Sequence, residues 1–191
     1  MKTDGNGSLS GLFFSHKSVE KLCKTFKSVF VMDCTYKTNR FGIPLLNIAG
    51  ITSTFRSFNA GFAFICEETE LEYTWALKAF SNVVVPAVIV TDREKSLMNA
   101  IESVFPDASN LLCIWHVNKN VLANCMKYRW DENNFENFIN DWNDLILSNS
   151  LEMFEYSWKA FVNDWSPSNI PAVQYLERTC LVYKKDCALL D

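Results

Sequence analysis

The chain has 191 residues, a length that suits one domain or one domain with a large insertion. Hydrophobic residues make up 49% and charged residues 21% of the chain, a balance that supports a globular core and excludes a disordered polymer. No apolar run approaches the ~20 residues needed to cross a bilayer, and the first ten residues lack the order of a signal peptide, so the sequence predicts a soluble intracellular protein with no membrane partner.

Charge and the metal-binding residue types narrow the function classes further. The net charge is −4 with a pI near 5.3, whereas a domain that grips DNA alone is usually basic. If DNA is the partner, metal ions or basic modules elsewhere have to supply much of the attraction. The seven cysteines form no C-x-x-C pair and indicate buried small side chains rather than a disulfide framework. With only two histidines, a His-rich zinc site is excluded.

The first part of the chain predicts an antiparallel meander that follows a polar N-terminal tail over residues 1–10. Runs of β-branched and aromatic residues predict strands over residues 29–33, 45–52 and 58–66. Gly61 lies inside the third of these runs and is the expected bulge or point of close approach. Short turns between the strands favour antiparallel pairing.

Helices and strands alternate in the middle of the chain. Helical spacing of apolar residues predicts helices over residues 70–80 and 97–105. A strand over residues 87–90 is expected to be buried on both faces because its apolar character is unbroken. A further strand over residues 111–115 is expected to lead into a helix over residues 117–128.

The last third of the chain predicts helices alone. Aromatic and aliphatic residues over 135–146 and 151–165 recur at helical spacing. Their Trp and Phe side chains are expected to form a helical core, and a base-stacking surface is the less favoured alternative. Pro167 and Pro171 are expected to separate this region from a last helix that starts at residue 171.

This order of elements predicts an α/β (α+β) fold: an RNase H-like mixed five-stranded sheet flanked by helices, with an all-α insertion in the C-terminal part. The catalytic core is expected over residues 11–128, and the helical insertion with the start of a final helix over residues 129–191. The order of elements alone does not establish a chemistry.

Two aspartates stand at the ends of apolar strands and are the candidate catalytic residues. Asp33 closes the run VFVMD and Asp92 closes AVIVTD. If the two strands are neighbours, the carboxylates converge on one or two divalent ions, which prefer oxygen ligands and serve phosphoryl transfer. The alternative for Asp33 is a turn residue at a strand end. The alternative for Asp92 is a helix cap, because Thr91-Asp92-Arg93-Glu94 fits the T-x-x-E capping box.

The segment Cys113-Ile-Trp-His116 places a thiol and an imidazole three residues apart. Such a pair is half of a zinc site, but no second pair lies nearby in the sequence. A Cys–His nucleophilic dyad is a weaker alternative because nothing indicates an oxyanion hole. A structural role for both residues stays open.

Two charged segments have plain structural interpretations. The acidic run over residues 67–70 is expected to be a solvated helix N-terminus that complements the helix dipole, with metal binding a distant second. Lys37, Asn39 and Arg40 form a polar turn, for which simple exposure is favoured over phosphate contact.

Four segments resemble blocks of the Mutator-like element (MULE) transposases, in the same order. FVMDCTYKTNRFGIPLLNIAGIT resembles the first catalytic block, with its acidic residue followed by x-T-Y-K-T-N. EETELEYTWAL resembles the helix that follows it, PAVIVTDREKSLMNAI the second catalytic block, and LLCIWHVNKNV the block with the C-x-x-H motif. The resemblance covers roughly residues 10 to 185.

The resemblance implies a D-D-E transposase of RNase H-like fold that works in the nucleus on transposon ends and target DNA, as a multimer. Asp33 takes the place of the first acidic residue and Asp92 of the second, both as ligands of Mg²⁺ or Mn²⁺ in a two-metal site. Cys113 and His116 match the C-x-x-H pair, which is expected to shape the active site or steady DNA near it. The third acidic residue of the family, a glutamate after the helical insertion, has no match here, since Glu155 and Glu177 lie in other contexts.

Three hypotheses follow. In the first, the chain is a fragment of a transposase that cleaves DNA and transfers strands, inactive as given for lack of the third acidic residue. In the second, it is a domesticated, non-catalytic DNA-associated regulator or interaction module, as in the far-red-response transcription factors of plants. In the third, it is an unrelated small nuclease or binding domain, and the motif matches are accidental.

Overall fold

The structure is a computed structural model that describes residues 1–35, 39–131, 134–148, 150–179 and 181. The chain divides into two compact units, Met1–Leu111 and Leu112–Asp191, each with its own core. Lys37 of the predicted polar turn lies outside the described residues, as does the end of the predicted last helix. None of the described helices is both long enough and apolar enough to cross a membrane.

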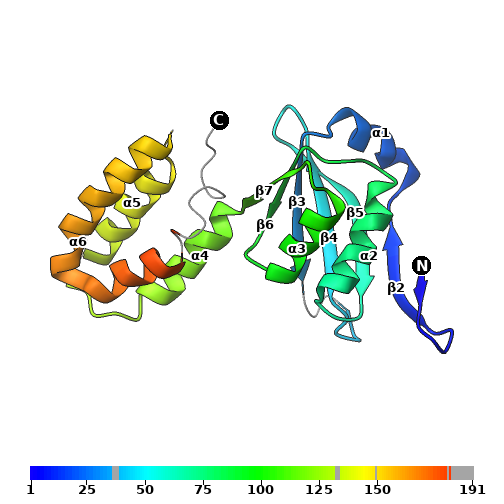
Figure 1. Ribbon diagram of the computed structural model, residues 1–191, viewed down its shortest axis with the longest axis horizontal. Helices are drawn as coiled ribbons and strands as arrows, with labels where there is room; N and C mark the ends of the chain where they lie inside the picture. Colours follow the sequence, from blue (N-terminus) through cyan, green and yellow to red (C-terminus); the bar gives the residue numbers. More distant parts are fainter. Residues whose placement is uncertain (36–38, 132–133, 149, 180, 182–191) are drawn as a thin grey trace. The chain divides into compact units, whose positions relative to one another are not determined.

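The first unit is built on a mixed sheet of seven strands, counted over the described residues (Figure 1). The sheet order is β1-β2-β5-β4-β3-β6-β7, in which β3, β4 and β5 form the predicted antiparallel meander and β6 lies parallel to β3. Its strands are β1 (Lys2–Thr3), β2 (Leu9–Phe14), β3 (Val29–Thr35), β4 (Leu45–Ile51), β5 (Ser57–Ile65), β6 (Val88–Thr91) and β7 (Ser109–Leu112), and its helices are α1 (Lys17–Thr25), α2 (Glu70–Ser81) and α3 (Lys95–Val104). The α/β class and the antiparallel meander of three strands are therefore confirmed.

The prediction of five strands is wrong, because the expected N-terminal tail contributes two more. The Asp4 carboxylate accepts hydrogen bonds from the backbone N–H groups of Asn6 and Ser8 at 2.9 and 2.8 Å, and this turn folds β1 back onto β2. β2 then pairs antiparallel with β5. The polar Gly- and Ser-bearing composition marks a hairpin turn here rather than a loose tail.

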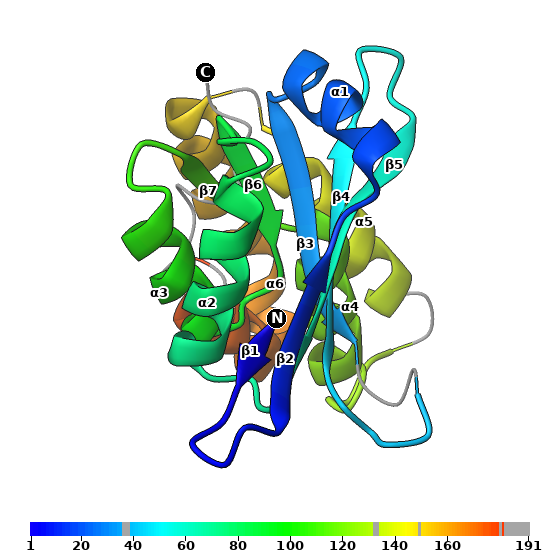
Figure 2. The ribbon, with the colours of Figure 1, turned by 90° about the vertical axis from the view of Figure 1, so that its right-hand side faces the viewer.

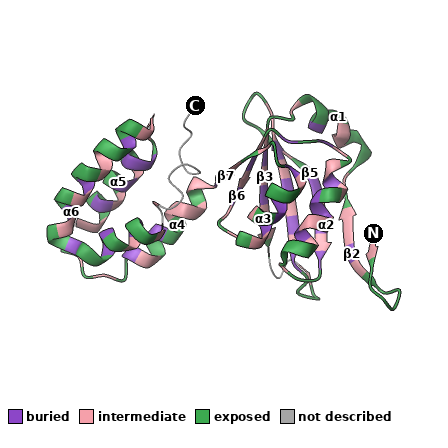
Figure 3. Ribbon diagram, viewed as in Figure 1, coloured by how far each residue is buried: buried purple, intermediate pink, exposed green. Residues whose placement is uncertain are grey.

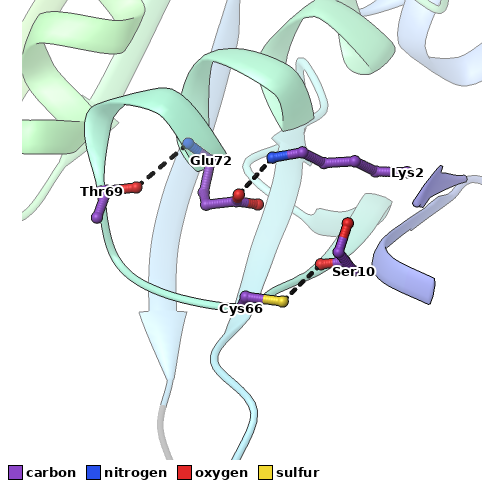
Figure 4. Close-up of polar contacts among 5 residues, drawn as sticks. All are labelled: Lys2, Ser10, Cys66, Thr69 and Glu72. Atoms are coloured by element: carbon purple, nitrogen blue, oxygen red, sulfur yellow. Dashed lines mark hydrogen bonds and ion pairs between the residues drawn. The ribbon is translucent and has the colours of Figure 1, made fainter. Parts of the chain in front are cut away.

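Side chains fasten this N-terminal hairpin to the rest of the unit (Figure 4). Lys2 Nζ forms an ion pair with the Glu72 carboxylate on α2, and the Cys66 thiol donates to the Ser10 carbonyl at 2.8 Å. Thr69 caps α2 by accepting from the Glu72 backbone N–H at 3.4 Å. The acidic run over residues 67–70 thus leads into a helix N-terminus, as predicted.

The two faces of the sheet differ in burial. α2 and α3 cover one face (Figure 2), and the strand residues directed towards them are buried (Figure 3), including Phe30 and Met32 on β3 and Leu46 and Ile48 on β4. The alternate residues, which point to the other face, are only partly buried. The period of two in the strands therefore separates a helix-covered core from a second face that remains accessible in part.

Gly61 is a point of close approach, as predicted. A Cβ atom at this position would lie 3.1 Å from ring atoms of Phe13 on the neighbouring β2. The irregularity in pairing lies beside it: Ile48 pairs with Gly61 and Ala49 with Asn59, so the extra residue of the bulge is Ala60.

The predicted strand over residues 111–115 is wrong in its limits. β7 ends at Leu112, Cys113 is the N-cap residue, and α4 (Ile114–Cys125) begins directly afterwards. A short apolar run does not distinguish a strand from the first turn of a buried helix.

The second unit is helical throughout its described part. α4, α5 (Asn134–Ile146) and α6 (Leu151–Thr179) enclose a core that includes Phe138, Trp142 and Phe161, so the predicted aromatic stripe is core. α4 contributes Val121 and Cys125 to this core, which places the division of the chain near residue 112 instead of the expected 128. α6 is interrupted at Asn169, whose φ of −155° and ψ of 70° are not helical, between the two prolines that predicted a break.

Candidate functional site

Asp33 and Asp92 follow the last paired residues of two adjacent parallel strands. Met32 of β3 pairs with Thr91 of β6, and each aspartate is the next residue of its chain. Neighbouring strands lie about 4.8 Å apart, so the backbones of the two aspartates lie side by side. Both aspartates are partly buried. The condition set by the sequence, that the two strands be neighbours, is met.

The alternation of the strands assigns these aspartates to one face. Met32 and Thr91 are buried on the face covered by α2 and α3, so the residues that follow them point to the other face of the sheet. The apolar Val31 and Val90, one register pair earlier on that face, are partly buried. The carboxylates therefore lie where an apolar strand surface meets solvent.

Asn47 extends the polar group onto the next strand. It lies on β4 directly opposite Asp33 in the antiparallel pair, and side chains of such pairs share a face. The Asn47 Oδ1 atom is buried and has no hydrogen-bond partner among the described residues. The sequence analysis missed this residue. Its signal was a single polar residue at the centre of the apolar strand LLNIAGI.

The predicted capping box at Thr91 is wrong. The N-cap residue of α3 is Glu94, whose two carboxylate oxygens accept from the backbone N–H groups of Ser96 at 3.1 Å and Leu97 at 2.7 Å. α3 starts at Lys95, three residues later than a cap at Thr91 and two residues later than a cap at Asp92 would require. Asp92 is therefore not the residue that caps the helix.

On the covered face, beside Asp33, lies a thiol that burial keeps neutral. Desolvation raises the pKa of Cys34 to about 12, and Tyr73 and Glu68 contact the same thiol. Burial also raises the pKa of the Tyr73 hydroxyl. The Cys34 thiol and the Tyr73 hydroxyl are therefore protonated at neutral pH.

Cys113 and His116 lie in the second unit, at the start of α4. Cys113 is the N-cap residue and makes no side-chain capping hydrogen bond, while the His116 ring packs edge-on against the exposed Trp115 at 4.7 Å between centroids. Within the described ranges, no group of three or more His, Cys, Asp and Glu side chains is arranged to hold a metal ion. The role of this pair as a site remains a prediction.

The predicted polar turn after β3 is described from Asn39 onwards. The Asn39 side chain accepts from the backbone N–H groups of Phe41 and Ile43 at 3.1 and 3.2 Å, and the Arg40 guanidinium lies over the Phe41 ring at 4.6 Å. Asn39 thus shapes the turn, and Arg40 is exposed. These contacts agree with the plain structural interpretation of the segment.

The chemistry available on this face is that of oxygen donors. Two carboxylates and one amide oxygen, on three adjacent strands, form a set that suits hard divalent cations. Asp33 and Asn47 lie on strands whose covered sides are packed in the core, and Asp92 is the first residue after β6.

Comparisons with known proteins match part of the chain to a protein family. The profile described as MULE transposase domain matches residues 29–120. The chain is 35% identical over 119 residues to a PKS-NRPS hybrid synthetase, cheA, of Chaetomium globosum, which covers 59% of this chain but 2% of that protein.

Two plant proteins match over more of the chain. In Arabidopsis thaliana, Protein FAR1-RELATED SEQUENCE 5 is 28% identical over 147 residues, 73% of this chain and 18% of that protein. Protein FAR-RED IMPAIRED RESPONSE 1 is 24% identical over 168 residues, 84% of this chain and 20% of that protein. The chain thus spans about a fifth of the length of these plant relatives.

The chain carries a MULE transposase-like domain. The matched segment contains both aspartates and Asn47, together with Cys113 and His116.

Proposed function

We propose that this domain is the divalent-metal-binding part of a MULE-type D-D-E transposase core, with Asp33 and Asp92 as metal ligands and DNA as the substrate of the full-length protein. The observation that carries the proposal is the parallel pairing of β3 with β6, which brings Asp33, inside β3, and Asp92, directly after β6, to adjacent backbone positions. If the two aspartates followed apolar strands only by chance, their strands would have no reason to be neighbours.

The residues present fit Mg²⁺ or Mn²⁺. The donors are carboxylate oxygens, which these hard ions prefer, and the buried Asn47 Oδ1 opposite Asp33 is an acceptor that lacks a partner in the described part of the chain. A bound ion of this kind supplies Lewis-acid polarisation of a phosphoryl oxygen and a more acidic bound water. The transposase in which this domain works would be nuclear and self-associating.

In this proposal the residues of the chain hold the metal ion and fix its position. Asp33 and Asp92 supply negative charge on a rigid strand edge, and the apolar Val31 and Val90 beside them limit access of bulk water. Removing water from around the carboxylates strengthens their attraction for a cation. Because the chain has a net charge of −4, much of the attraction for DNA would have to come from metal and from other parts of the full-length protein.

Metal binding by purified variants tests the proposal. Titration with Mn²⁺ in a calorimeter is expected to show binding by the wild type, and Asp33→Asn or Asp92→Asn is expected to weaken it by more than about tenfold, since each removes one charged ligand. Asp107→Asn, which changes a carboxylate outside the site, is the matched control. Unchanged Mn²⁺ affinity in both site variants would reject the proposed function.

A second candidate is a domesticated, non-catalytic DNA-associated regulator. It is favoured by the plant relatives, whose names refer to the far-red response. Nicking of a labelled DNA duplex by the full-length protein in Mn²⁺ separates the two candidates. Metal-dependent nicking that Asp33→Asn abolishes supports the enzyme, whereas duplex binding without nicking supports the regulator.

A further inference from the structure

Asn47 is the polar residue at the centre of the otherwise apolar strand β4. It lies between Asp33 of β3 and Phe62 of β5 in the two antiparallel ladders. Leu45 and Ala49 are its neighbours two residues away on the same face of β4. Apart from Asp33 and Thr35, the strand neighbours around it on this face are apolar. A polar amide in such a setting needs a partner for its oxygen.

The oxygen of this amide is the unusual atom. Asn47 Oδ1 is buried and accepts no hydrogen bond from the described residues. Most buried polar atoms in folded proteins have a partner, and an exception points to a water, an ion or a functional role. The nearest formal charge across the strand pair is the Asp33 carboxylate, which also lacks a hydrogen to donate when ionised. A cation beside Asp33, or a water bound to that cation, would satisfy the Asn47 oxygen.

We propose that Asn47 Oδ1 is the third oxygen donor for the ion held by Asp33 and Asp92, either as a direct ligand or by accepting a hydrogen bond from a coordinated water. This inference rests on the proposed function and goes beyond it by assigning a residue outside the two motif aspartates. Asn47 contributes a neutral donor, so the local charge stays at two carboxylates. A neutral third donor gives this chain weaker metal binding than a third carboxylate would.

Substitutions of one residue test the assignment without needing catalysis. Asn47→Leu removes the donor and fills the apolar face, so the metal-free fold is expected to keep or raise its melting temperature, because the buried acceptor without a partner is gone. Its Mn²⁺ affinity, measured by calorimetry and by electron paramagnetic resonance of free Mn²⁺, is expected to fall about tenfold. Asn47→Asp adds a third carboxylate and is expected to bind Mn²⁺ more tightly than the wild type.

Controls separate this inference from the proposal on which it rests. Asn59→Ala changes an exposed asparagine on the neighbouring β5 and is expected to leave Mn²⁺ binding unchanged. If Asn47→Leu and Asn47→Asp bind Mn²⁺ as the wild type does while Asp33→Asn does not, Asn47 is no donor and the metal site stands without it. If Asp33→Asn also binds normally, the proposed function fails together with this inference.

Discussion

The two faces of the central sheet are built by the same strands and serve opposite purposes. On the face covered by α2 and α3, Phe30, Met32 and Ile89 are fully buried in one apolar core. On the other face, the alternate residues of the same strands include Asp33 and Asn47, and Asp92 follows at the end of β6. The covered face holds the apolar core, and the polar side chains of Asp33 and Asn47 lie on the other face.

This division fixes the backbones of the two aspartates next to each other. Two carboxylates on adjacent strands repel each other, and the folded chain has to supply the free energy that holds them there. Here the strands that bear them are fixed by core packing on their reverse side. Strands fixed in this way hold the backbone beside Asp33 rigidly before any ligand arrives.

The largest effect is expected from the covered face. The Phe80 ring lies within 6.5 Å of the rings of Phe13, Phe30 and Phe105, measured between centroids, and is fully buried. Phe80→Ala is expected to cost about 3–5 kcal/mol of unfolding free energy in urea titrations, because it leaves a cavity among aromatic side chains. Phe62→Ala, on the partly exposed face, is the control. Equal losses from the two substitutions would break the distinction between the faces.

A smaller effect is expected from the helix cap beside the site. Glu94→Ala removes the acceptor of two backbone hydrogen bonds of α3 and is expected to lower the unfolding free energy by about 0.5–2 kcal/mol. Asp92→Ala is expected to leave the helix cap intact. If Asp92→Ala instead produced the loss and Glu94→Ala did not, the capping interpretation of Asp92 would be restored.

Thiol chemistry distinguishes the covered face from the surface. Burial raises the pKa of Cys34 from its ordinary value of 9.0 to about 12, whereas Cys66 is exposed. Cys66 is expected to react with a thiol reagent at pH 8 in the folded protein, and Cys34 only after unfolding. Comparison of the Cys34→Ala and Cys66→Ala variants assigns the reacting thiol. Fast labelling that Cys34→Ala removes would contradict the burial of this thiol.

The same raised pKa gives a pH dependence with a defined sign. Between pH 9 and pH 12 the unfolded Cys34 thiol loses its proton while the folded one keeps it, so the unfolded state binds fewer protons. Stability contributed by Cys34 is therefore complete below about pH 9 and is lost as the pH rises towards 12. Urea midpoints of the wild type are expected to fall more steeply over this range than those of Cys34→Ala.

The smallest effect on stability is expected at the site itself. Asp33→Asn removes one of two neighbouring charges and is expected to change the unfolding free energy of the metal-free protein by no more than about 0.5 kcal/mol. In excess Mn²⁺, the melting temperature of the wild type is expected to rise by more than that of Asp33→Asn, because stabilisation by a ligand grows with its affinity for the folded state. A large loss of stability in Asp33→Asn without metal would make Asp33 a structural residue.

Strong periodic patterns made most of the fold predictable. The meander, both crossover helices and the aromatic helical core followed from alternation and helical spacing. The hairpin at residues 2–14 did not, because a turn made by Asp4 depends on one side chain and leaves little trace in composition. The boundary between β7 and α4 was missed because Leu111 to Trp115 is apolar in both states.

The candidate site was predictable only where residues stood in motifs. Asp33 and Asp92 end apolar runs, and their juxtaposition needed one further fact, the parallel pairing of β3 with β6. Asn47 stands in no motif, since its meaning depends on the register that places it opposite Asp33. Register is a property of paired strands, and a single sequence does not specify it before the pairing is known.

The most direct test of the central claim is the anomalous diffraction signal of a crystal of this protein soaked in Mn²⁺. The account predicts one peak within coordinating distance, about 2.0–2.2 Å for such an ion, of oxygens from both Asp33 and Asp92, and near Asn47 Oδ1. A crystal in which the two carboxylates point apart, or in which Mn²⁺ binds only elsewhere, would contradict the account.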